Sequence, residues 1–145
     1  MKTEIINSPL PLELYGFEDQ ANGPNPSETA FRLMNKMWQI VKSNNLPNKG
    51  INVWVYGAGG NIFAGVELTE PPKQDTGLQF KTVVLSKYGY HKHIGSYSLI
   101  RQAGQQMRAE LTANGFEIIP PYIEIYGHHS PDESKTETEL LMQLR

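Results

Sequence analysis

Two stretches of the chain carry apolar residues at the spacing of an amphipathic helix. Between residues 30 and 41, apolar side chains recur at i, i+3, i+4, i+7, i+8 and i+11, which places them on one helix face. Just before, residues 25–28 (Asn-Pro-Ser-Glu) offer a cap, a proline at the first helical position and an early glutamate. A second stripe covers residues 99–111, with Ser96 as a candidate cap and residues 114–115 (Asn-Gly) as a stop signal. Each stretch predicts one helix.

Short segments rich in apolar and aromatic residues flank both predicted helices. Around the first helix they cover residues 12–17, 52–56 and 62–68, and around the second they cover residues 80–85, 122–126 and 138–144. Such runs, bounded by Gly, Pro and Asn, are typical of strands. The order strand, helix, strand, strand therefore occurs twice. It predicts an α+β fold in which two helices lie on one face of mainly antiparallel sheets.

The two sets of elements match each other at one constant offset along the chain. The matched positions are residues 52–57 with 122–127, Met37 with Met107, and Asn44 with Asn114. A helix, a loop and a strand that all match at one offset indicate a duplication. We expect a single domain over residues 1–145, with repeat 1 at about 1–70 and repeat 2 at about 78–145, related by a pseudo-twofold axis.

The duplication is broken at one position, where Trp54 of the first copy is replaced by Glu124 in the second. Because side chains alternate along a strand, Trp54 shares a face with Tyr56, opposite the valines that flank it. We expect the aliphatic face to pack on the helices, and the aromatic face, which carries Glu124, to point elsewhere. Under a pseudo-twofold axis, the two aromatic faces can meet across one cleft.

Glu124 is therefore the strongest candidate for a functional residue. A buried carboxylate costs free energy unless a cation or hydrogen-bond donors compensate for its lost hydration. One explanation is a structural ion pair with Arg101 or Arg145. The other is a cationic ligand, which we favour because the neighbouring aromatic residues leave little room for a salt bridge.

Composition narrows the classes of function. The 145 residues have a net charge of −2 and a pI of about 6.1, and no basic block is present to follow a phosphate backbone, so direct nucleic-acid binding is not expected. The chain has no cysteine, which excludes disulfides and thiolate metal sites. No signal peptide and no apolar stretch long enough to span a bilayer is present, so we expect a cytoplasmic protein that does not interact with membranes.

The remaining chemical motifs are weak. Histidines occur in two pairs, His91 with His93 and His128 with His129, but neither pair has the i, i+4 helix spacing of a zinc site. We therefore expect no metal and no cofactor. Residues 57–60 (Gly-Ala-Gly-Gly) resemble a phosphate-binding loop, but a strand and not a helix follows them, so we interpret them as a hairpin turn.

Three segments together resemble one known family. They are residues 93–97 (His-Ile-Gly-Ser-Tyr), the helix that ends at residues 114–115, and residues 120–126 (Pro-Pro-Tyr-Ile-Glu-Ile-Tyr). They are similar to the GyrI-like small-molecule-binding domains, also called bacterial transcription activator effector-binding domains. The resemblance implies a duplicated fold with a ligand cleft between the halves, and a glutamate at position 124 on the cleft floor that meets cationic, lipophilic ligands. The predicted first strand begins near Leu12, so we expect a stand-alone member without a DNA-binding module.

Aromatic residues around Glu124 are the other candidates for ligand binding. Aromatic faces attract cations by roughly 0.5–2 kcal/mol each. The expected walls are Trp54, Tyr56, Tyr122 and Tyr126, the expected rim residues are Tyr88, Tyr90 and Tyr97, and Trp38 and Phe63 either close the base of the cleft or belong to the core.

The resemblance to this family implies three possible functions. The favoured one is binding of cationic, lipophilic or aromatic small molecules, for sensing or sequestration. The second is a hydrolase that detoxifies electrophilic, cyclopropane-type molecules, in which Glu124 acts as acid or base beside Tyr126. The third is a protein-interaction module, such as a gyrase inhibitor, in which the acidic run 132–139 faces a basic partner. That run is also typical of a solvated loop that leads into an edge strand.

Overall fold

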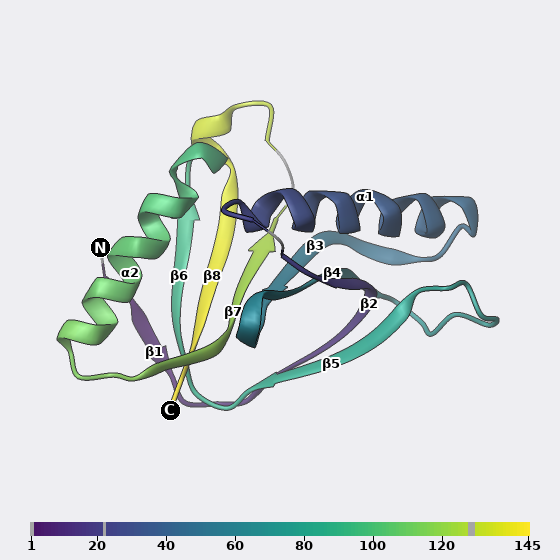
Figure 1. Cartoon of the computed structure of the whole chain (residues 1–145). Coiled ribbons are helices and arrows are strands. Elements are labelled where there is room, and N and C mark those ends of the chain that lie inside the picture. Colours follow the sequence, from purple (N-terminus) through teal and green to yellow (C-terminus); the bar gives the residue numbers. More distant parts are fainter. Residues whose placement is uncertain (1, 22, 128–129) are drawn as a thin grey trace. The chain divides into compact units, whose positions relative to one another are not determined.

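The computed structural model describes residues 2–21, 23–127 and 130–145. The chain forms two compact units. We call Pro11–Val83 the N-terminal unit, and Met1–Leu10 together with Val84–Arg145 the C-terminal unit. In each unit one long helix lies against antiparallel strands (Figure 1). The predicted α+β class is confirmed.

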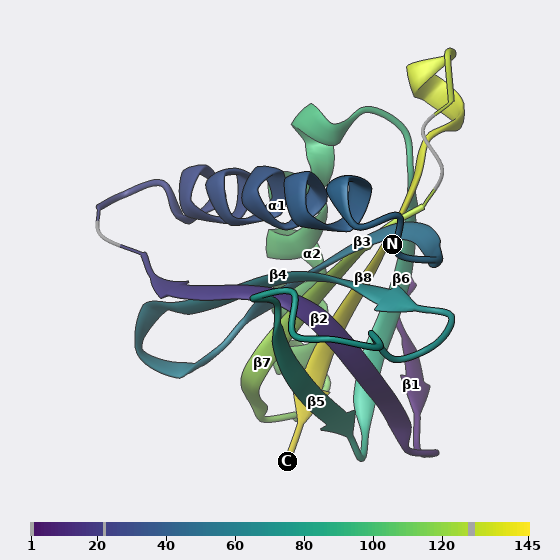
Figure 2. The same ribbon diagram turned by 90° about the vertical axis from the view of Figure 1, so that its right-hand side faces the viewer.

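The N-terminal unit consists of one helix and its strands. Its elements are β2 (Leu10–Gln20), α1 (Pro26–Ser43), β3 (Asn48–Tyr56), β4 (Asn61–Leu68) and β5 (Gln79–Leu85). The strand order is β3-β4-β2-β5, and β4 is antiparallel to both β2 and β3. Helix α1 lies along one face of β4 and β2 (Figure 2). The predicted hairpin turn at residues 57–60 joins β3 to β4 and is confirmed.

The C-terminal unit has the same order of strand, helix, strand and strand. Its elements are β1 (Glu4–Ile6), β6 (Tyr88–Ile94), α2 (Ile100–Ala113), β7 (Ile118–Tyr126) and β8 (Glu137–Leu144). The strand order is β1-β6-β8-β7, so β8 lies between β6 and β7 and is not the edge strand that we predicted. The reason is that Leu140, Met142 and Leu144 are buried on one face of β8 and Leu141 is buried on the other, which suits a central strand.

The two helices end in the same way. Asn44 and Asn114 are the C-terminal caps, and the side-chain amide of each donates to the carbonyl four residues earlier, Ile40 at 2.9 Å and Glu110 at 2.8 Å. The next residue takes a positive φ in both units, 51° at Asn45 and 83° at Gly115. The predicted stop signals are thus confirmed.

The two helices begin differently. Asn25 is the N-cap of α1, with Pro26 as its first residue, as predicted. Ser96 caps a separate 3-10 turn, Tyr97–Leu99, where its hydroxyl accepts from the Ser98 amide at 3.2 Å. Helix α2 starts only after this turn.

The prediction of the first strand of repeat 2 is wrong. Residues 80–85 belong to β5, which neighbours β2, whereas the strand that precedes α2 is β6. Strand β6 was missed because its buried positions are not aliphatic. A Cβ atom at Gly89 would lie 2.9 Å from a methyl group of Leu111, so glycine allows the close approach of α2, and His93 is a buried polar residue.

The prediction of which strand face meets the helices is also wrong. Tyr122 and Tyr126 pack with Ile100 and Met107 of α2, so the aromatic face is the one that faces the helix. In the N-terminal unit, the Trp54 ring contacts the Phe31 ring of α1 with a centroid distance of 5.0 Å. The aliphatic residues on the opposite face are also buried, for example Val53 at 2% exposure and Ile123 at 0%. Alternation alone cannot tell which of two apolar faces receives a helix.

No helix in the described part of the chain is long and apolar enough to cross a membrane.

Candidate ligand-binding site around Glu124

The carboxylate of Glu124 lies in the interior of the C-terminal unit, with the side chain 8% exposed. The Tyr126 hydroxyl donates to Oε1 at 2.6 Å, and the Tyr122 hydroxyl donates to Oε2 at 2.7 Å. Hydrogen bonds to a charged acceptor contribute about 1.5–3 kcal/mol each. The two tyrosines therefore offset much of the free energy that burial of the carboxylate costs.

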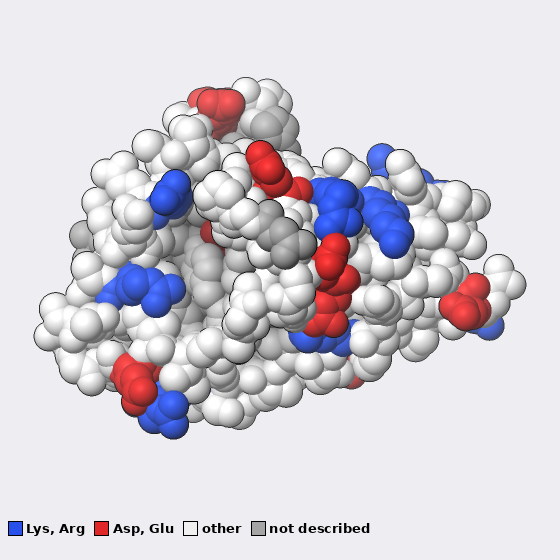
Figure 3. Space-filling model, viewed as in Figure 1, with Lys and Arg blue, Asp and Glu red and all other residues white. Residues whose placement is uncertain are grey.

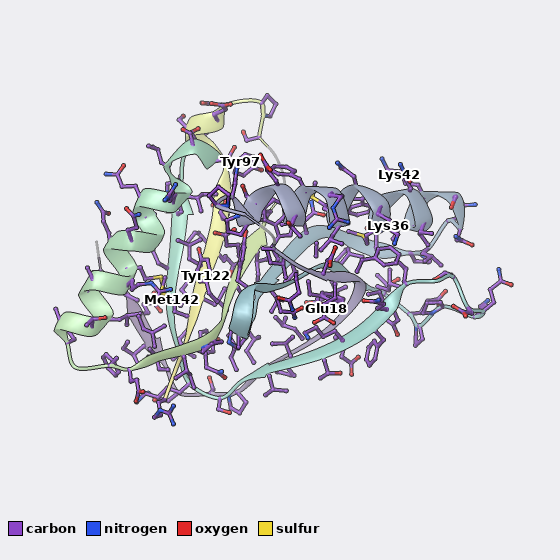
Figure 4. All side chains as sticks on the ribbon, viewed as in Figure 1. Glu18, Lys36, Lys42, Tyr97, Tyr122 and Met142 are labelled. Carbon is purple, nitrogen blue, oxygen red and sulfur yellow. The ribbon has the colours of Figure 1, made fainter. Side chains whose placement is uncertain are left out.

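The strand geometry of β7 explains why these three side chains meet. Residues 122, 124 and 126 alternate along one strand, so their side chains lie on the same face. They pair in register with Met142, Leu140 and Thr138 of β8, respectively. Figure 4 shows Tyr122 and Met142 on the side of the strands towards α2, where both belong to the packing around this helix.

Gly104 of α2 leaves room above Tyr122. A methyl group at Gly104 would meet the Tyr122 hydroxyl at 3.6 Å, which is an ordinary contact distance. The helix therefore approaches the Tyr122 hydroxyl closely without covering it with a larger side chain. Sequence reasoning missed this residue, although a glycine in the middle of an apolar helix stripe is a usable signal of close approach.

Tyr97 extends the aromatic group outwards. Its ring meets the Tyr126 ring edge to face, with a centroid distance of 5.6 Å, and 44% of the residue is exposed. Leu99, in the same turn as Tyr97, is 49% exposed. An apolar, partly exposed border thus connects Glu124, through Tyr126, to the surface.

Two predicted rim residues lie on the other face of the sheet. Tyr88 and Tyr90 alternate with His91, which shares the α2 side with Leu140, so the structure does not bring these tyrosines together with Glu124. Burial raises the pKa of Tyr90 far above its ordinary value, and the Glu139 carboxylate raises it further. The sequence prediction failed here because it did not include β6 and therefore assigned no face to its residues.

Two polar residues on the α2 side of the sheet were not predicted. Thr138 of β8 pairs in register with Tyr126 on one side and with His93 of β6 on the other. Thr138 is 0% exposed and His93 is 9% exposed. A buried polar pair at adjacent strand positions can be found only once the register of β6, β8 and β7 is known.

In the N-terminal unit, Trp54 occupies the position equivalent to Glu124. It is 4% exposed and contacts Phe31. Trp38 lies on the same side of the strands, where its Nε1 donates to Asn52 Oδ1 at 2.6 Å and so connects α1 to β3. Tyr56 shares the strand face of Trp54 and is half-buried.

Phe63 belongs to the core and not to the aromatic face of Trp54. It pairs in register with Val55, whereas Trp54 pairs with Ala64, so Phe63 points to the opposite side of the sheet. Its residue is 1% exposed, and the Lys81 ammonium lies 5.8 Å from its ring centroid. Of the two roles that we left open for Phe63, the core role fits this geometry.

Charged side chains are mixed over the visible surface. On the face in Figure 3, Lys and Arg lie among Asp and Glu without forming a large patch of one sign. Arg145, one of the two expected ionic partners of Glu124, instead pairs with Glu117 at 2.9 Å. Within the described ranges, no group of three or more histidine or acidic side chains is arranged to hold a metal. The prediction for His128 and His129 concerns residues outside the described part.

A surface depression of about 420 Å³ lies beside the end of α1. Residues 44–47 and 70–74, together with Thr76, line it. Polar residues and prolines predominate, and none of the predicted site residues takes part. We therefore place the candidate site at Glu124, where a buried charge and aromatic rings occur together.

Known structures share this fold over essentially the whole chain. SAV2435 bound to tetraphenylphosphonium is 16% identical with a TM-score of 0.67, over 100% of this chain and 94% of that chain. The EcmrR C-terminal domain is 13% identical with a TM-score of 0.74, over 100% and 99% of the two chains. A hydrolase from Listeria innocua is 11% identical with a TM-score of 0.57, over 99% and 92%. No protein-family model and no curated protein matches the sequence.

At these identities the likeness concerns the fold. It confirms the fold that the resemblance to GyrI-like domains implied. The roles of the individual site residues stay predictions.

Proposed function

We propose that the protein binds cationic, lipophilic small molecules at Glu124. The observation that carries this proposal is a buried carboxylate held between two tyrosine hydroxyls, on a strand face rich in aromatic rings. Hydroxyl groups are neutral donors, so these two hydrogen bonds hold the carboxylate in place without cancelling its negative charge. It can accept a cation while the tyrosines keep it in place.

The physical chemistry favours a cation that is large and poorly hydrated. A small ammonium would have to lose strong hydration before it entered an interior site, whereas a delocalised or shielded cation loses little. Aromatic faces add roughly 0.5–2 kcal/mol each to such a cation when water is excluded. Tyr97 and Tyr126 form such an aromatic pair beside the carboxylate. SAV2435, which has the same fold, is bound to tetraphenylphosphonium, a cation of this type.

Calorimetric titration with tetraphenylphosphonium tests the proposal. Glu124→Gln keeps the shape but removes the charge, and we expect it to weaken binding at least about 30-fold, because loss of one partner of a buried charge pair costs roughly 2–5 kcal/mol. Glu117→Gln is the matched control, since Glu117 belongs to the same unit but pairs with Arg145 at the surface. Equal affinity of wild type and Glu124→Gln would reject the role of the charge. The prediction that Trp54 and Tyr56 also contact the ligand rests on the sequence repeat.

Hydrolysis is a second candidate, favoured by the short contact between Tyr126 and Glu124. A buried carboxylate 2.6 Å from a phenol hydroxyl can accept a proton from water, while a tyrosine hydroxyl donates one to the opened ring. A protein with the same fold is a hydrolase. Turnover of an electrophilic cyclopropane substrate by wild type, and its loss in Tyr126→Phe with binding intact, is the expected result if the protein is an enzyme. If wild type binds such a substrate without turning it over, hydrolysis is rejected and binding is the remaining function.

The other expectations stay predictions. They are a gyrase-type protein partner, a cytoplasmic location, and the absence of direct nucleic-acid binding.

A further inference from the structure

Three threonines bury a hydroxyl that lacks a hydrogen-bond partner among the described residues, namely Thr3, Thr136 and Thr138. A buried hydroxyl without a partner costs free energy, because it gives up its bonds to water and gains none in return. Thr138 is the most completely buried of the three and lies in the middle of a row of side chains that includes the candidate site. The unpaired hydroxyl of Thr138 is therefore the one whose cost most needs a compensating role.

The row crosses three strands on the α2 side of the sheet. Tyr126 of β7, Thr138 of β8 and His93 of β6 are directly opposite one another in register. Directly opposite side chains have their Cβ atoms roughly 4.5–5.5 Å apart. The Tyr126 hydroxyl donates a hydrogen bond to Glu124 Oε1. Thr138 is therefore one strand away from a residue that holds the carboxylate.

His93 bounds this row on the side away from Tyr126. Its Nε2 lies 3.0 Å from the backbone carbonyl oxygen of Ser96. A carbonyl oxygen can only accept, so the Nε2–H group of His93 donates this hydrogen bond. The contact links the imidazole to the turn that precedes α2.

We propose that Thr138 Oγ1 is a second recognition group of the site at Glu124, and that it binds a hydroxyl or carbonyl group on the cationic ligand. This inference rests on the proposed function. A threonine hydroxyl donates one hydrogen bond and accepts others, so it suits either group. The ligand class is thus narrowed to lipophilic cations that carry a neutral polar group about one aromatic ring away from the charge.

The test compares tetraphenylphosphonium with the ortho, meta and para isomers of (hydroxyphenyl)triphenylphosphonium, by calorimetric titration. We expect wild type to prefer one hydroxylated isomer about 3- to 10-fold, the range of one net hydrogen bond. Thr138→Val should remove this preference and leave the affinity for tetraphenylphosphonium unchanged. Thr138→Ser, which keeps the hydroxyl, should retain the preference.

Thr3→Val is the matched control, because it also removes a buried hydroxyl that lacks a partner. Thermal melting of each variant checks the fold, and we expect Thr138→Val to melt no lower than wild type, since valine replaces an unpaired polar group by a methyl group of the same shape. The ranking of the probes by wild type reports on the proposal even if the valine variant misfolds, because equal binding of all probes would overturn it.

The possible failures are distinguishable. If wild type binds none of the phosphonium ions, the proposed function fails. If it binds all of them equally, or if Thr138→Val keeps the preference, the role of Thr138 is overturned while the role of Glu124 stands. An equal loss of affinity for every probe in Thr138→Val would also overturn it, because such a loss indicates a purely structural threonine.

Discussion

Trp54 and Glu124 occupy the same place in their two units and satisfy burial in opposite ways. Each lies on the helix-facing side of the strand that follows the helix, at 4% and 8% exposure. The Trp54 ring packs against an aromatic ring of α1. The Glu124 carboxylate instead accepts hydrogen bonds from two tyrosine hydroxyls of its own strand. The fold thus accepts either residue, provided that the neighbours two positions away match it.

The neighbours differ on one side of each residue. Both strands have a tyrosine two positions after the central residue, Tyr56 and Tyr126. Two positions before it, the N-terminal unit has Asn52 and the C-terminal unit has Tyr122. Asn52 Oδ1 accepts from Trp38 and so supports helix packing, whereas Tyr122 supports the carboxylate. On this strand face, two residues and not one therefore differ between the candidate site and its structural counterpart.

Placing a carboxylate at the structural position is expected to have the largest effect. Trp54→Glu should destabilise the protein by at least about 4 kcal/mol, because it removes a buried aromatic ring and leaves a charge where Tyr122 has no equivalent. Urea unfolding followed by Trp38 fluorescence measures this change. Trp54→Phe is the control and should cost clearly less. A glutamate variant that unfolds at the wild-type urea concentration would contradict the comparison.

Removing one hydroxyl from the carboxylate should have the next largest effect. Tyr122→Phe and Tyr126→Phe each remove one hydrogen bond to the Glu124 carboxylate, and each should lower the free energy of unfolding by about 1.5–3 kcal/mol. Tyr15→Phe keeps the ring that packs on Phe80 and should change stability by less than about 0.5 kcal/mol. Chemical denaturation at neutral pH measures the free energy of unfolding of all three variants. Equal losses in the three variants would show that the two hydroxyls at Glu124 do not stabilise the fold more than an ordinary tyrosine hydroxyl does.

A smaller difference between the two units concerns the dependence of stability on pH. His91 of β6 lies opposite Leu140, as Phe17 of β2 lies opposite Ala64, so the C-terminal unit has an ionisable group where the N-terminal unit has a phenylalanine. Burial, and then the neighbouring His93, lowers the pKa of His91. The folded state therefore binds the proton less readily than the unfolded state, and stability should be lost as pH falls below about 6.5, the ordinary histidine value.

His91→Phe tests this contrast through the urea midpoint at several pH values between neutral and mildly acidic conditions. We expect the variant to lose less stability than wild type over this interval. An unchanged pH dependence would mean that other groups, chiefly carboxylates, determine the acid sensitivity.

The smallest expected effect concerns the helix above the site. The sequence repeat aligns Gly104 of α2 with Met34 of α1. Gly104→Ala should stabilise the protein by about 0.5–1 kcal/mol, because alanine favours a helix and its methyl group meets the Tyr122 hydroxyl at an ordinary 3.6 Å. Thermal melting checks the gain. Gly104→Met, which copies the N-terminal unit, should instead weaken tetraphenylphosphonium binding by filling the space near Tyr122.

The fold class followed from local patterns. The stripe at residues 30–41 lies within α1, and the stop signals at Asn44 and at residues 114–115 mark the true helix ends. Such signals are local, because a helix period and a cap depend on neighbours within one or two turns. The strand before α2 was missed for the converse reason, since Gly89 and His93 are buried only through the packing of α2 and the turn that precedes it.

The candidate site was predicted in part. Glu124, Tyr122 and Tyr126 came from a broken repeat and from strand alternation, and the structure joins them by hydrogen bonds. Tyr88 and Tyr90 were expected at the rim because they are aromatic and flank the start of the second helix, and the register of β6 places them on the face opposite Glu124.

The sequence alone therefore determined the helices, the duplication and the position at which the two copies differ, because periodicity and caps are properties of neighbouring residues. The tertiary structure alone decided which strand face receives the helices, which tyrosines reach Glu124, and that Thr138 lies beside them. These depend on strand register and on helix packing. Both are set by side chains far apart in the chain, and a shift of one residue in register would exchange the two faces of a strand.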